Sequence, residues 1–418
     1  MESWQRNLYA AWLAQFIAIL GFSFVLPFLP LYVQTLGIET LEEAELWSGL
    51  LWFGAGVAMA VSAPFWGVLA DRVGRKVMVE RSMFAGALFV AGMGLASDVN
   101  QLLVLRIMQG AFTGTVSASI ALVSTVVPRE RIGYSLGLMQ MAVFAGASIG
   151  PLIGGVLADV LGFRVSFALT GALLALAGLL VLFLVDEPFE PRKADGHLGL
   201  SGFLDGIRLT LSSRSLLPLV VVIFSIQVSV QIIGPILPLF VKTLSGEGEY
   251  IASTSGAIIA AAGVASAASA IVVGRLSDRV GYRRVLILAA AVAGIIYIPQ
   301  AFVRSGLELL VLRGILGLFI GCMLPTANAL IGLLTPMHRR GSVYGVTASA
   351  GAWGQAFGPM LGASVAAGLG IRSVFLVTAA VLVLLSLWVR VAVREPEARV
   401  ETELEEVSPR PPSLIDGE

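Results

Sequence analysis

Two copies of one charged turn hold the residues best suited to electrostatic chemistry. The first copy contains Gly67, Asp71, Arg72, Gly74, Arg75 and Lys76, and the second contains Gly274, Asp278, Arg279, Gly281 and Arg283. Basic residues beside an apolar run anchor it at the membrane surface. An aspartate at the end of such a run needs a partner, such as an arginine or a helix N-terminus. Anchoring therefore accounts for the basic residues of the turn but not for Asp71.

A single charged residue, Arg106, lies inside an apolar run, between Leu105 and Ile107. A charge within a membrane span costs at least roughly 2.5–3.5 kcal/mol on insertion scales and usually marks a substrate or ion pathway. Arg313 occupies the matching position in the second copy. Two interpretations stay open. Either the arginines serve function, or they are inherited structure whose side chains extend to the interface.

Helices that cross a lipid bilayer must position these charges, because the rest of the chain is unusually apolar. The 418 residues are 57% hydrophobic and 13% charged, whereas a soluble protein carries about 25% charged residues. The zero net charge gives no indication of a nucleic-acid partner. The single cysteine, Cys322, excludes a disulfide framework. We expect no cofactor and no metal site.

Apolar runs of about 20 residues predict twelve membrane spans. Spans 1 to 6 cover 8–33, 47–69, 77–96, 102–126, 135–158 and 163–185, and spans 7 to 12 cover 216–241, 254–276, 285–303, 309–334, 343–367 and 373–393. Residues 186–214 predict a linker that contains either a helix along the membrane interface or an irregular loop. Residues 394–418 are acid-rich and predict a disordered tail.

Lysine and arginine are distributed unevenly between alternate connections. With the N-terminus inside, the cytoplasmic segments hold 21 of the 27 Lys and Arg residues and the outer loops hold 4. Because positive residues favour the cytoplasmic side, we expect both termini in the cytoplasm. The chain is then a multi-pass protein of the cell (plasma or inner) membrane.

The two sets of six spans are copies of each other. Segment 27–33 matches 235–241 at an offset of 208, and Arg106 matches Arg313 at an offset of 207. An offset that drifts by one residue over six spans indicates a duplication. An even number of spans per copy makes the halves parallel repeats about an axis normal to the membrane. We therefore predict an all-α membrane protein with two pseudo-symmetric six-helix bundles, 1–185 and 215–393, joined by the linker 186–214 and followed by the tail 394–418.

These motifs resemble those of the major facilitator superfamily over about residues 7–396. The charged turn is similar to the family's loop motif, and Arg106, Gln109 and Gly110 match a second motif in span 4. In span 5, the motif typical of drug:proton antiporters is matched by Gly146, Gly150, Pro151, Gly154 and Gly155. The resemblance implies the major facilitator fold and a bacterial multidrug exporter of the 12-helix type.

The resemblance also assigns roles to the charged turn. It implies that Asp71 and Arg75 latch the two halves when the cavity faces outward and release them when it faces inward. Asp278 and Arg283 would be a degraded second copy of this latch. Simple anchoring of the spans is the alternative.

Proton coupling has few candidate residues. The resemblance links Arg106 to coupling. No carboxylate lies in the middle of spans 1, 4, 7 or 10, so Asp71 and Asp159 are the remaining acidic candidates.

Small residues recur at four-residue spacing in several spans. Span 5 has Gly146, Gly150 and Gly154, and the matching glycines recur in span 11. Small residues let helix backbones approach closely in lipid. We predict that span 2 packs on span 11 and span 5 on span 8, forming two seams between the halves. Tight packing without motion is the alternative to sliding seams.

The resemblance implies a substrate cavity lined by spans 1, 4, 7 and 10 with their partners. Phe24 and a few polar side chains are candidates for its lining: Gln15, Gln109, Gln227, Gln231, Asn328 and Gln355. An uncharged lining that contains aromatic residues suits bulky, poorly hydrated substrates. Sugars require many precise hydrogen bonds and suit it less.

Residues and resemblance together predict a secondary-active exporter of hydrophobic or amphipathic small molecules (multidrug efflux), driven by proton antiport with alternating access. The chain has no Gly-x-x-x-x-Gly-Lys-Ser/Thr phosphate loop, which excludes ATP hydrolysis through that motif, and we expect no enzyme activity. A metabolite transporter of the same fold and a non-transporting membrane sensor are the alternatives. We expect a monomer in the lipid bilayer whose partners are its substrate and protons.

Overall fold

A computed structural model describes residues 3–128, 131–187, 212–213, 216–245, 250–335 and 340–393. Within these ranges, only the backbone is described for residues 64, 67, 68, 71, 133, 271–279 and 340–342. The regular structure in these ranges is helical, without strands. Most of the predicted linker, the predicted tail and the side chains of five motif residues lie outside the described residues. These five are Gly67, Asp71, Gly274, Asp278 and Arg279.

The helices follow the predicted spans in order. The N-terminal half contains α1 (Ser3–Phe24), α2 (Leu29–Thr35), α3 (Leu41–Val73), α4 (Arg75–Met93), α5 (Val99–Phe112), α6 (Thr115–Val126), α7 (Ile132–Leu161) and α8 (Phe163–Leu184). The C-terminal half contains α10 (Leu217–Gln231), α11 (Leu237–Ser245), α12 (Ile251–Val280), α13 (Tyr282–Gln300), α14 (Gly306–Leu334), α15 (Arg340–Leu369) and α16 (Ser373–Ala392). Within the described residues, nine helical segments are long and apolar enough to cross a membrane. The three remaining predicted spans coincide with α4, with the α10–α11 pair and with α15.

Spans 1, 4 and 7 are broken into two helices each, whereas the sequence predicted continuous helices. The turn between α1 and α2 contains Pro27, and the turn between α10 and α11 contains Gly234 and Pro235. Proline lacks the backbone N–H that a continuous helix requires. Span 4 breaks at Gly114, whose φ of 123° lies in the region that favours glycine.

The broken turns of spans 1 and 7 repeat the same hydrogen bond 208 residues apart. The backbone N–H of Leu29 donates to the carbonyl of Val25 at 3.0 Å. The backbone N–H of Leu237 donates to the carbonyl of Ile233 at 2.9 Å. The duplication inferred from the sequence is therefore present in the backbone geometry of the two halves.

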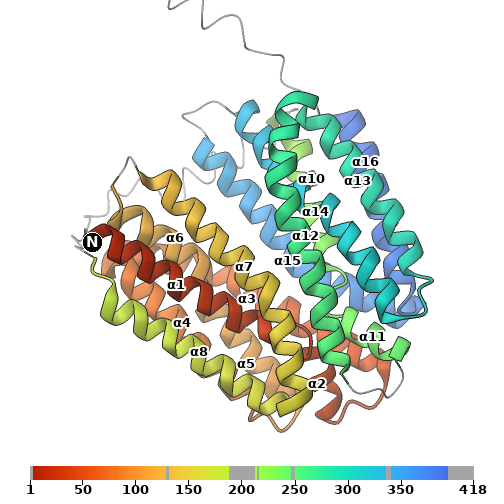
Figure 1. The fold of residues 1–418 in the computed structure, drawn as a ribbon, viewed down its shortest axis with the longest axis horizontal. Helices are drawn as coiled ribbons and strands as arrows, with labels where there is room; N and C mark the ends of the chain where they lie inside the picture. The colour runs from red at the N-terminus through yellow and green to blue at the C-terminus, as the bar shows by residue number, and fades with distance from the viewer. Residues whose placement is uncertain are drawn as a thin grey trace, which may run out of the picture.

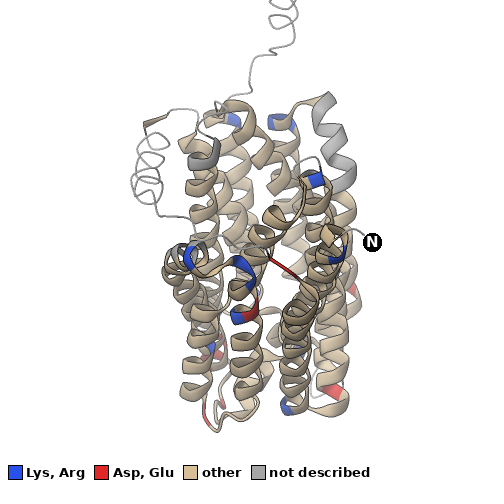
Figure 2. Cartoon of the chain, turned by 90° about the vertical axis from the view of Figure 1, so that its left-hand side faces the viewer, with Lys and Arg blue, Asp and Glu red and all other residues tan. Residues whose placement is uncertain are grey.

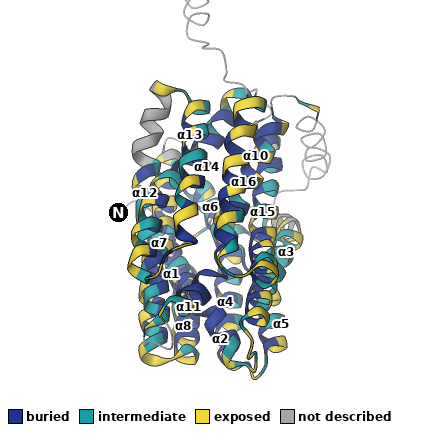
Figure 3. Cartoon of the chain, turned by 90° about the vertical axis from the view of Figure 1, so that its right-hand side faces the viewer, coloured by how far each residue is buried: buried dark blue, intermediate teal, exposed yellow. Residues whose placement is uncertain are grey.

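The outward faces of the helices carry large apolar side chains. Leu88 on α4, Leu288 on α13 and Leu384 on α16 are 69%, 62% and 63% exposed. Figure 3 shows exposed and buried residues alternating along the helices, and Figure 2 shows a largely uncharged ribbon. A surface of this kind is stable against lipid tails and unfavourable in water.

The two halves approach each other at one end only. Figure 1 shows α1–α8 and α10–α16 as two groups that converge where α2 and α11 lie and diverge toward the N-terminus. We name the end that holds α2 and α11 the closed end, and the opposite end the open end. At the closed end, the Nζ of Lys242 on α11 donates a hydrogen bond to the Oε1 of Gln34 on α2 at 2.6 Å.

Two helix pairs form seams between the halves, α3 with α15 and α7 with α12, as the glycine pattern predicted. A β-carbon on Gly256 of α12 would overlap the carbonyl oxygen of Pro151 on α7. A β-carbon on Gly49 of α3 would overlap the side chain of Ala363 on α15. Glycine at these two positions therefore sets how closely the halves approach.

Toward the open end, the same helix pairs separate. A β-carbon on Gly137 of α7 or on Gly345 of α15 would meet no neighbouring atom within 4 Å. These two glycines lie 208 residues apart, so both seams open at matching positions. The seams are thus shut near the closed end and parted near the open end.

The predicted glycine stripe of span 5 faces a neighbour within its own half rather than the seam. β-Carbons on Gly146, Gly150 and Gly154 would crowd the backbone or side chains of α1, and the matching glycines of span 11 face α10. The seam uses a different stripe of α7, on which Gly155 approaches the carbonyl of Ala252 on α12. Both stripes of α7 contain small residues, so spacing alone did not distinguish them.

Gly256→Ala should destabilise the closed seam, because its methyl group would overlap the Pro151 carbonyl. Overpacking of this kind costs about 1–3 kcal/mol. We expect a lower thermal unfolding midpoint for the purified protein in detergent. Gly137→Ala is the matched control, since its methyl group enters open space and alanine favours the helix over glycine by about 1 kcal/mol. A Gly256→Ala protein as stable as the Gly137→Ala protein would contradict this account of the seam.

Candidate functional site

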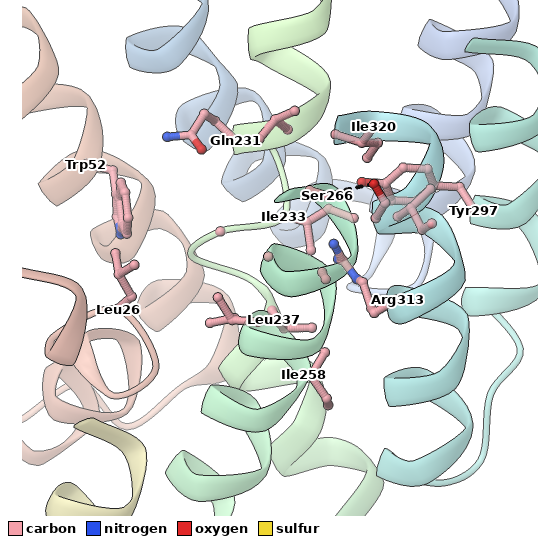
Figure 4. Close-up of a pocket in the computed structure, with 17 residues that line it drawn as sticks. Leu26, Trp52, Gln231, Ile233, Leu237, Ile258, Ser266, Tyr297, Arg313 and Ile320 are labelled. Carbon is pink, nitrogen blue, oxygen red and sulfur yellow. Dashed lines mark hydrogen bonds between the residues drawn. The ribbon is translucent and has the colours of Figure 1, made fainter. Parts of the chain in front are cut away.

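A cavity of about 250 Å³ lies between the halves, against the broken turn of span 7 (Figure 4). Most of its wall comes from α10 to α14 of the C-terminal half. Leu26 and Trp52 complete it from the N-terminal half. Apolar side chains such as Ile233, Leu237 and Ile258 form most of the surface. The cavity can therefore receive a small apolar body that contacts both halves.

Four polar side chains line this cavity: Gln231, Ser266, Tyr297 and Arg313. Two of them are already engaged, because the hydroxyl of Ser266 donates to the carbonyl of Gly317 at 3.0 Å and that of Tyr297 donates to a carbonyl of α10 at 3.5 Å. Arg313 is only 8% exposed, and its Nε and Nη2 have no hydrogen-bond partner. Its guanidinium lies 5.6 Å from the centre of the Tyr297 ring. The cavity thus combines an apolar wall with one under-satisfied positive charge.

Arg106 occupies the matching place in the N-terminal half, on α5. Its Nη1 donates to the Oε1 of Gln109 at 2.6 Å, and its guanidinium lies 5.5 Å from the centre of the Trp52 ring. Its Nε has no partner. Since Trp52 also lines the cavity, Arg106 lies directly behind the cavity wall.

Asp159 joins the two halves at the closed end. Its carboxylate accepts hydrogen bonds from the backbone N–H groups of Ala252 and Ser253, at 3.2 and 2.7 Å, and from the hydroxyl of Ser253 at 2.5 Å. Ala252 and Ser253 lie in the first turn of α12, where the positive end of the helix dipole favours a negative charge. Asp159 therefore caps a helix of the other half, beside the Lys242 bond.

The first charged turn is tied to its own half. Gly74 has a φ of 101° and links α3 to α4. The carboxylate of Glu187 accepts hydrogen bonds from the backbone N–H groups of Arg75 and Lys76, at 3.1 and 2.8 Å. The side chains of Arg75 and Lys76 donate to backbone carbonyls of α6 and α8, at 3.3 and 2.8 Å. Arg72 is exposed. These bonds all stay within the N-terminal half.

The second charged turn shows the same arrangement in its described part. Gly281 has a φ of 97° and precedes α13. The guanidinium of Arg283 donates to the carbonyl of Arg390 in the last turn of α16. In this structure both turns therefore hold helices of one half together.

The predicted cavity residues occupy different places. Gln231 lines the cavity, and Gln109 binds Arg106 behind its wall. Gln15 is buried on α1 with both amide atoms unpaired, and Phe24 packs on Gly154. The remaining three lie on α10, α14 and α15: Gln227 against the glycines of α15, Asn328 with its carbonyl bonded to Tyr344, and Gln355 exposed. A role in substrate binding stays a prediction for all of them.

Sequence reasoning did not single out several residues of the site. Trp52, Ser266 and Tyr297 line the cavity, and none of them was among the predicted lining residues. Glu187 was not among the predicted site residues, although its carboxylate caps α4. The polar residue Ser266 within an apolar span was the available signal for the cavity.

The chain matches the family model described as Major Facilitator Superfamily over residues 11–264 and 249–415. The chain belongs to the major facilitator superfamily. This membership confirms the predicted family and the predicted all-helical fold, and it makes the chain a membrane transporter rather than an enzyme.

Relatives within this superfamily match nearly the whole chain. The chain is 39% identical to Multidrug resistance protein MdtG of Dickeya zeae over 384 residues, which are 91% of this chain and 93% of that protein. It is 37% identical to the protein of the same name from Klebsiella pneumoniae over 396 residues, 95% of each chain.

Two solved structures share the major facilitator fold with the chain. One is a bacterial homolog of the human lysosomal transporter Spinster, in an inward-facing and unoccupied conformation. Its TM-score is 0.76 at 16% identity, over 94% of this chain and 97% of the other. A mutant of the nucleoside transporter NupG gives a TM-score of 0.77 at 16% identity, over 93% of this chain and 100% of the other.

Asp159→Ala should loosen the closed end, because α12 loses its cap from the other half. Loss of a helix cap costs about 0.5–2 kcal/mol. We expect faster maleimide labelling of a cysteine placed at Leu31, a buried residue of α2 at the closed end, in a protein whose Cys322 is replaced by Ala.

Asp98→Ala is the matched control for this experiment. Asp98 also caps a helix, since its carboxylate accepts bonds from the N–H groups of Asn100 and Gln101, but it does so within its own half. Equal labelling rates in the Asp159→Ala and Asp98→Ala proteins would show that Asp159 does not hold the halves together.

Proposed function

We propose that this chain is a secondary-active exporter of hydrophobic or amphipathic small molecules. The observation that carries the proposal is the largely apolar cavity between the halves, to which Leu26 and Trp52 contribute from one half and α10 to α14 from the other. A substrate bound there contacts both halves and can couple its release to their rearrangement. The relatives named Multidrug resistance protein MdtG support an export function.

The exporter works by alternating access of this cavity to the two membrane faces. The closed end is held by the seam contacts, the Lys242–Gln34 bond and the Asp159 cap, while the seams part toward the open end. The excess of Lys and Arg in alternate segments supports a cytoplasmic location for both termini, in the cell inner membrane. The open end then faces the cytoplasm, from which an exporter loads its substrate. A cavity formed by the two halves of one chain supports a monomer as the transporting unit.

Proton antiport drives the export in this proposal. Arg106 is linked to the cavity through Trp52, so movement of that ring on substrate binding changes the surroundings of the charge. Asp159, which caps α12 from the other half, is the acidic coupling candidate at the closed end. When the halves come together at the open end, Asp71 and Arg75 latch that end. Asp278 and Arg283 are the second copy of this latch.

Efflux from proteoliposomes tests the proposal. A panel of neutral, cationic and anionic fluorescent dyes should leave the vesicles faster when a proton gradient is imposed. Arg106→Gln should lower the gradient-driven rate at least about tenfold, equivalent to the loss of about 1.4 kcal/mol. Arg131→Gln, at an exposed arginine beside α7, is the control and should retain the rate.

Two results would contradict the proposal separately. Transport of no dye would remove the export function. Transport that ignores the gradient would remove proton antiport and leave export in place.

A further inference from the structure

Arg313 lies deep in the cavity without a counter-charge. It is seven residues into α14, about 10 Å along the helix axis from its start at the closed end. Within the described residues, the ion pairs join Arg6 to Asp186 and Lys76 to Glu80, and neither involves Arg313. A buried charge without a counter-charge is unfavourable in a medium of low dielectric constant. A bound anion would remove this penalty.

The unpaired hydrogen-bond donors of Arg313 are buried in the wall of the cavity. Nε and Nη2 have no partner, and Figure 4 shows the guanidinium directed toward Ile233 and Ser266. Nε and one Nη form the edge of a guanidinium that binds a carboxylate with two parallel hydrogen bonds. The unpaired atoms therefore match a carboxylate or sulfonate group.

The two related arginines differ in whether a side chain of their own helix pairs with them. Arg106 is the counterpart of Arg313, and its Nη1 is satisfied by Gln109, one turn along α5. The position that matches Gln109 at the same offset of 207 holds Leu316, which lines the cavity. The C-terminal half therefore has the arginine without a glutamine at the matching position.

The rest of the cavity is suited to an apolar body. Leu316, Ile320 and Leu237 contribute aliphatic surface, and Trp52 and Tyr297 contribute aromatic rings. These walls surround the one charged side chain of the cavity. The arrangement fits a molecule with one anionic group and an otherwise apolar body.

We propose that Arg313 is the anion-recognition residue of this transporter, and that the cavity binds amphipathic organic anions in preference to neutral molecules of the same shape. The inference rests on the proposed export function and narrows its substrate class. The anionic group of the ligand accepts hydrogen bonds from the guanidinium of Arg313, whose Nε and Nη2 lack a partner within the protein. Its apolar body lies against Trp52 and Leu316.

The test compares one anion with its neutral amide. Dansylglycine and dansylglycinamide differ only in the carboxylate, and their binding to the purified protein is measured by fluorescence. We expect the wild-type protein to bind the anion at least about tenfold more tightly, since hydrogen bonds to charged groups contribute the most. Arg313→Met should bring the ratio of the two affinities close to one, and Arg313→Lys should restore part of it.

A second variant keeps the test independent of any folding defect at Arg313. Leu316→Gln places an amide acceptor beside Arg313, as Gln109 lies beside Arg106, so it should compete with the anionic group for the guanidinium and lower the ratio while both arginines remain. Arg304→Gln, at an exposed arginine of the closed end, is the control and should leave the ratio unchanged. A wild-type ratio close to one, or a high ratio that survives both Arg313→Met and Leu316→Gln, would overturn the proposal.

The dye panel separates this inference from the export function. Efflux of neutral dyes alone would keep the export function and overturn the anion preference. A high anion-to-amide ratio in the purified protein would support the Arg313 site even without efflux of any dye.

Discussion

The close approach of α7 to α12 and of α3 to α15 is the contact on which the rest of this structure depends. Apolar side chains gain little from packing on each other instead of on lipid tails, so helices in a membrane associate through close van der Waals contact and a few polar bonds. Gly256 against the Pro151 carbonyl and Gly49 against Ala363 provide that contact near the closed end. Because few hydrogen bonds cross the seams, the helices can separate without leaving many hydrogen-bonding groups unpaired.

The position of the seams decides where the cavity lies and what it contains. The broken turn of span 7 places its loop between the halves, and α14 brings Arg313 beside it. Two related arginines then have different surroundings, since Arg106 has Gln109 as a partner and Arg313 has Leu316 in that place. The duplicated fold thus supplies matching helices, and the residue at position 109 or 316 decides whether the arginine has a side-chain partner on its own helix.

Long-range features of the fold could be read from the sequence, because each depends on a repeated local pattern. Apolar runs of membrane length predicted the spans, and the constant offset predicted the duplication. Finer features depend on packing and could not be read in this way. Small residues occur on two stripes of α7, so the sequence did not show that Gly150 faces α1 while Gly155 faces α12.

The breaks in the membrane helices and the residues of the cavity wall could not be predicted from local sequence patterns either. A proline such as Pro27 in an apolar run is compatible with a kink or with a full break, and only the tertiary packing distinguishes them. The cavity wall includes Trp52 and Tyr297, which were not predicted to line it, because an aromatic residue in an apolar span does not reveal which face of the helix meets the cavity. The sequence singled out the charged residues near the cavity but not the aromatic residues that line it.

Paired distances at both ends of the molecule test the central claim most directly. Spin labels on cysteines at Gly137 and Gly345 report the open end, and labels at Glu39 and Ser245 report the closed end, in a protein whose Cys322 is replaced by Ala. Alternating access about the seams predicts opposite changes when ligand and pH are varied, so that the Gly137–Gly345 distance shortens as the Glu39–Ser245 distance lengthens. Transport accompanied by fixed distances, or by changes of the same sign at both ends, would contradict the account.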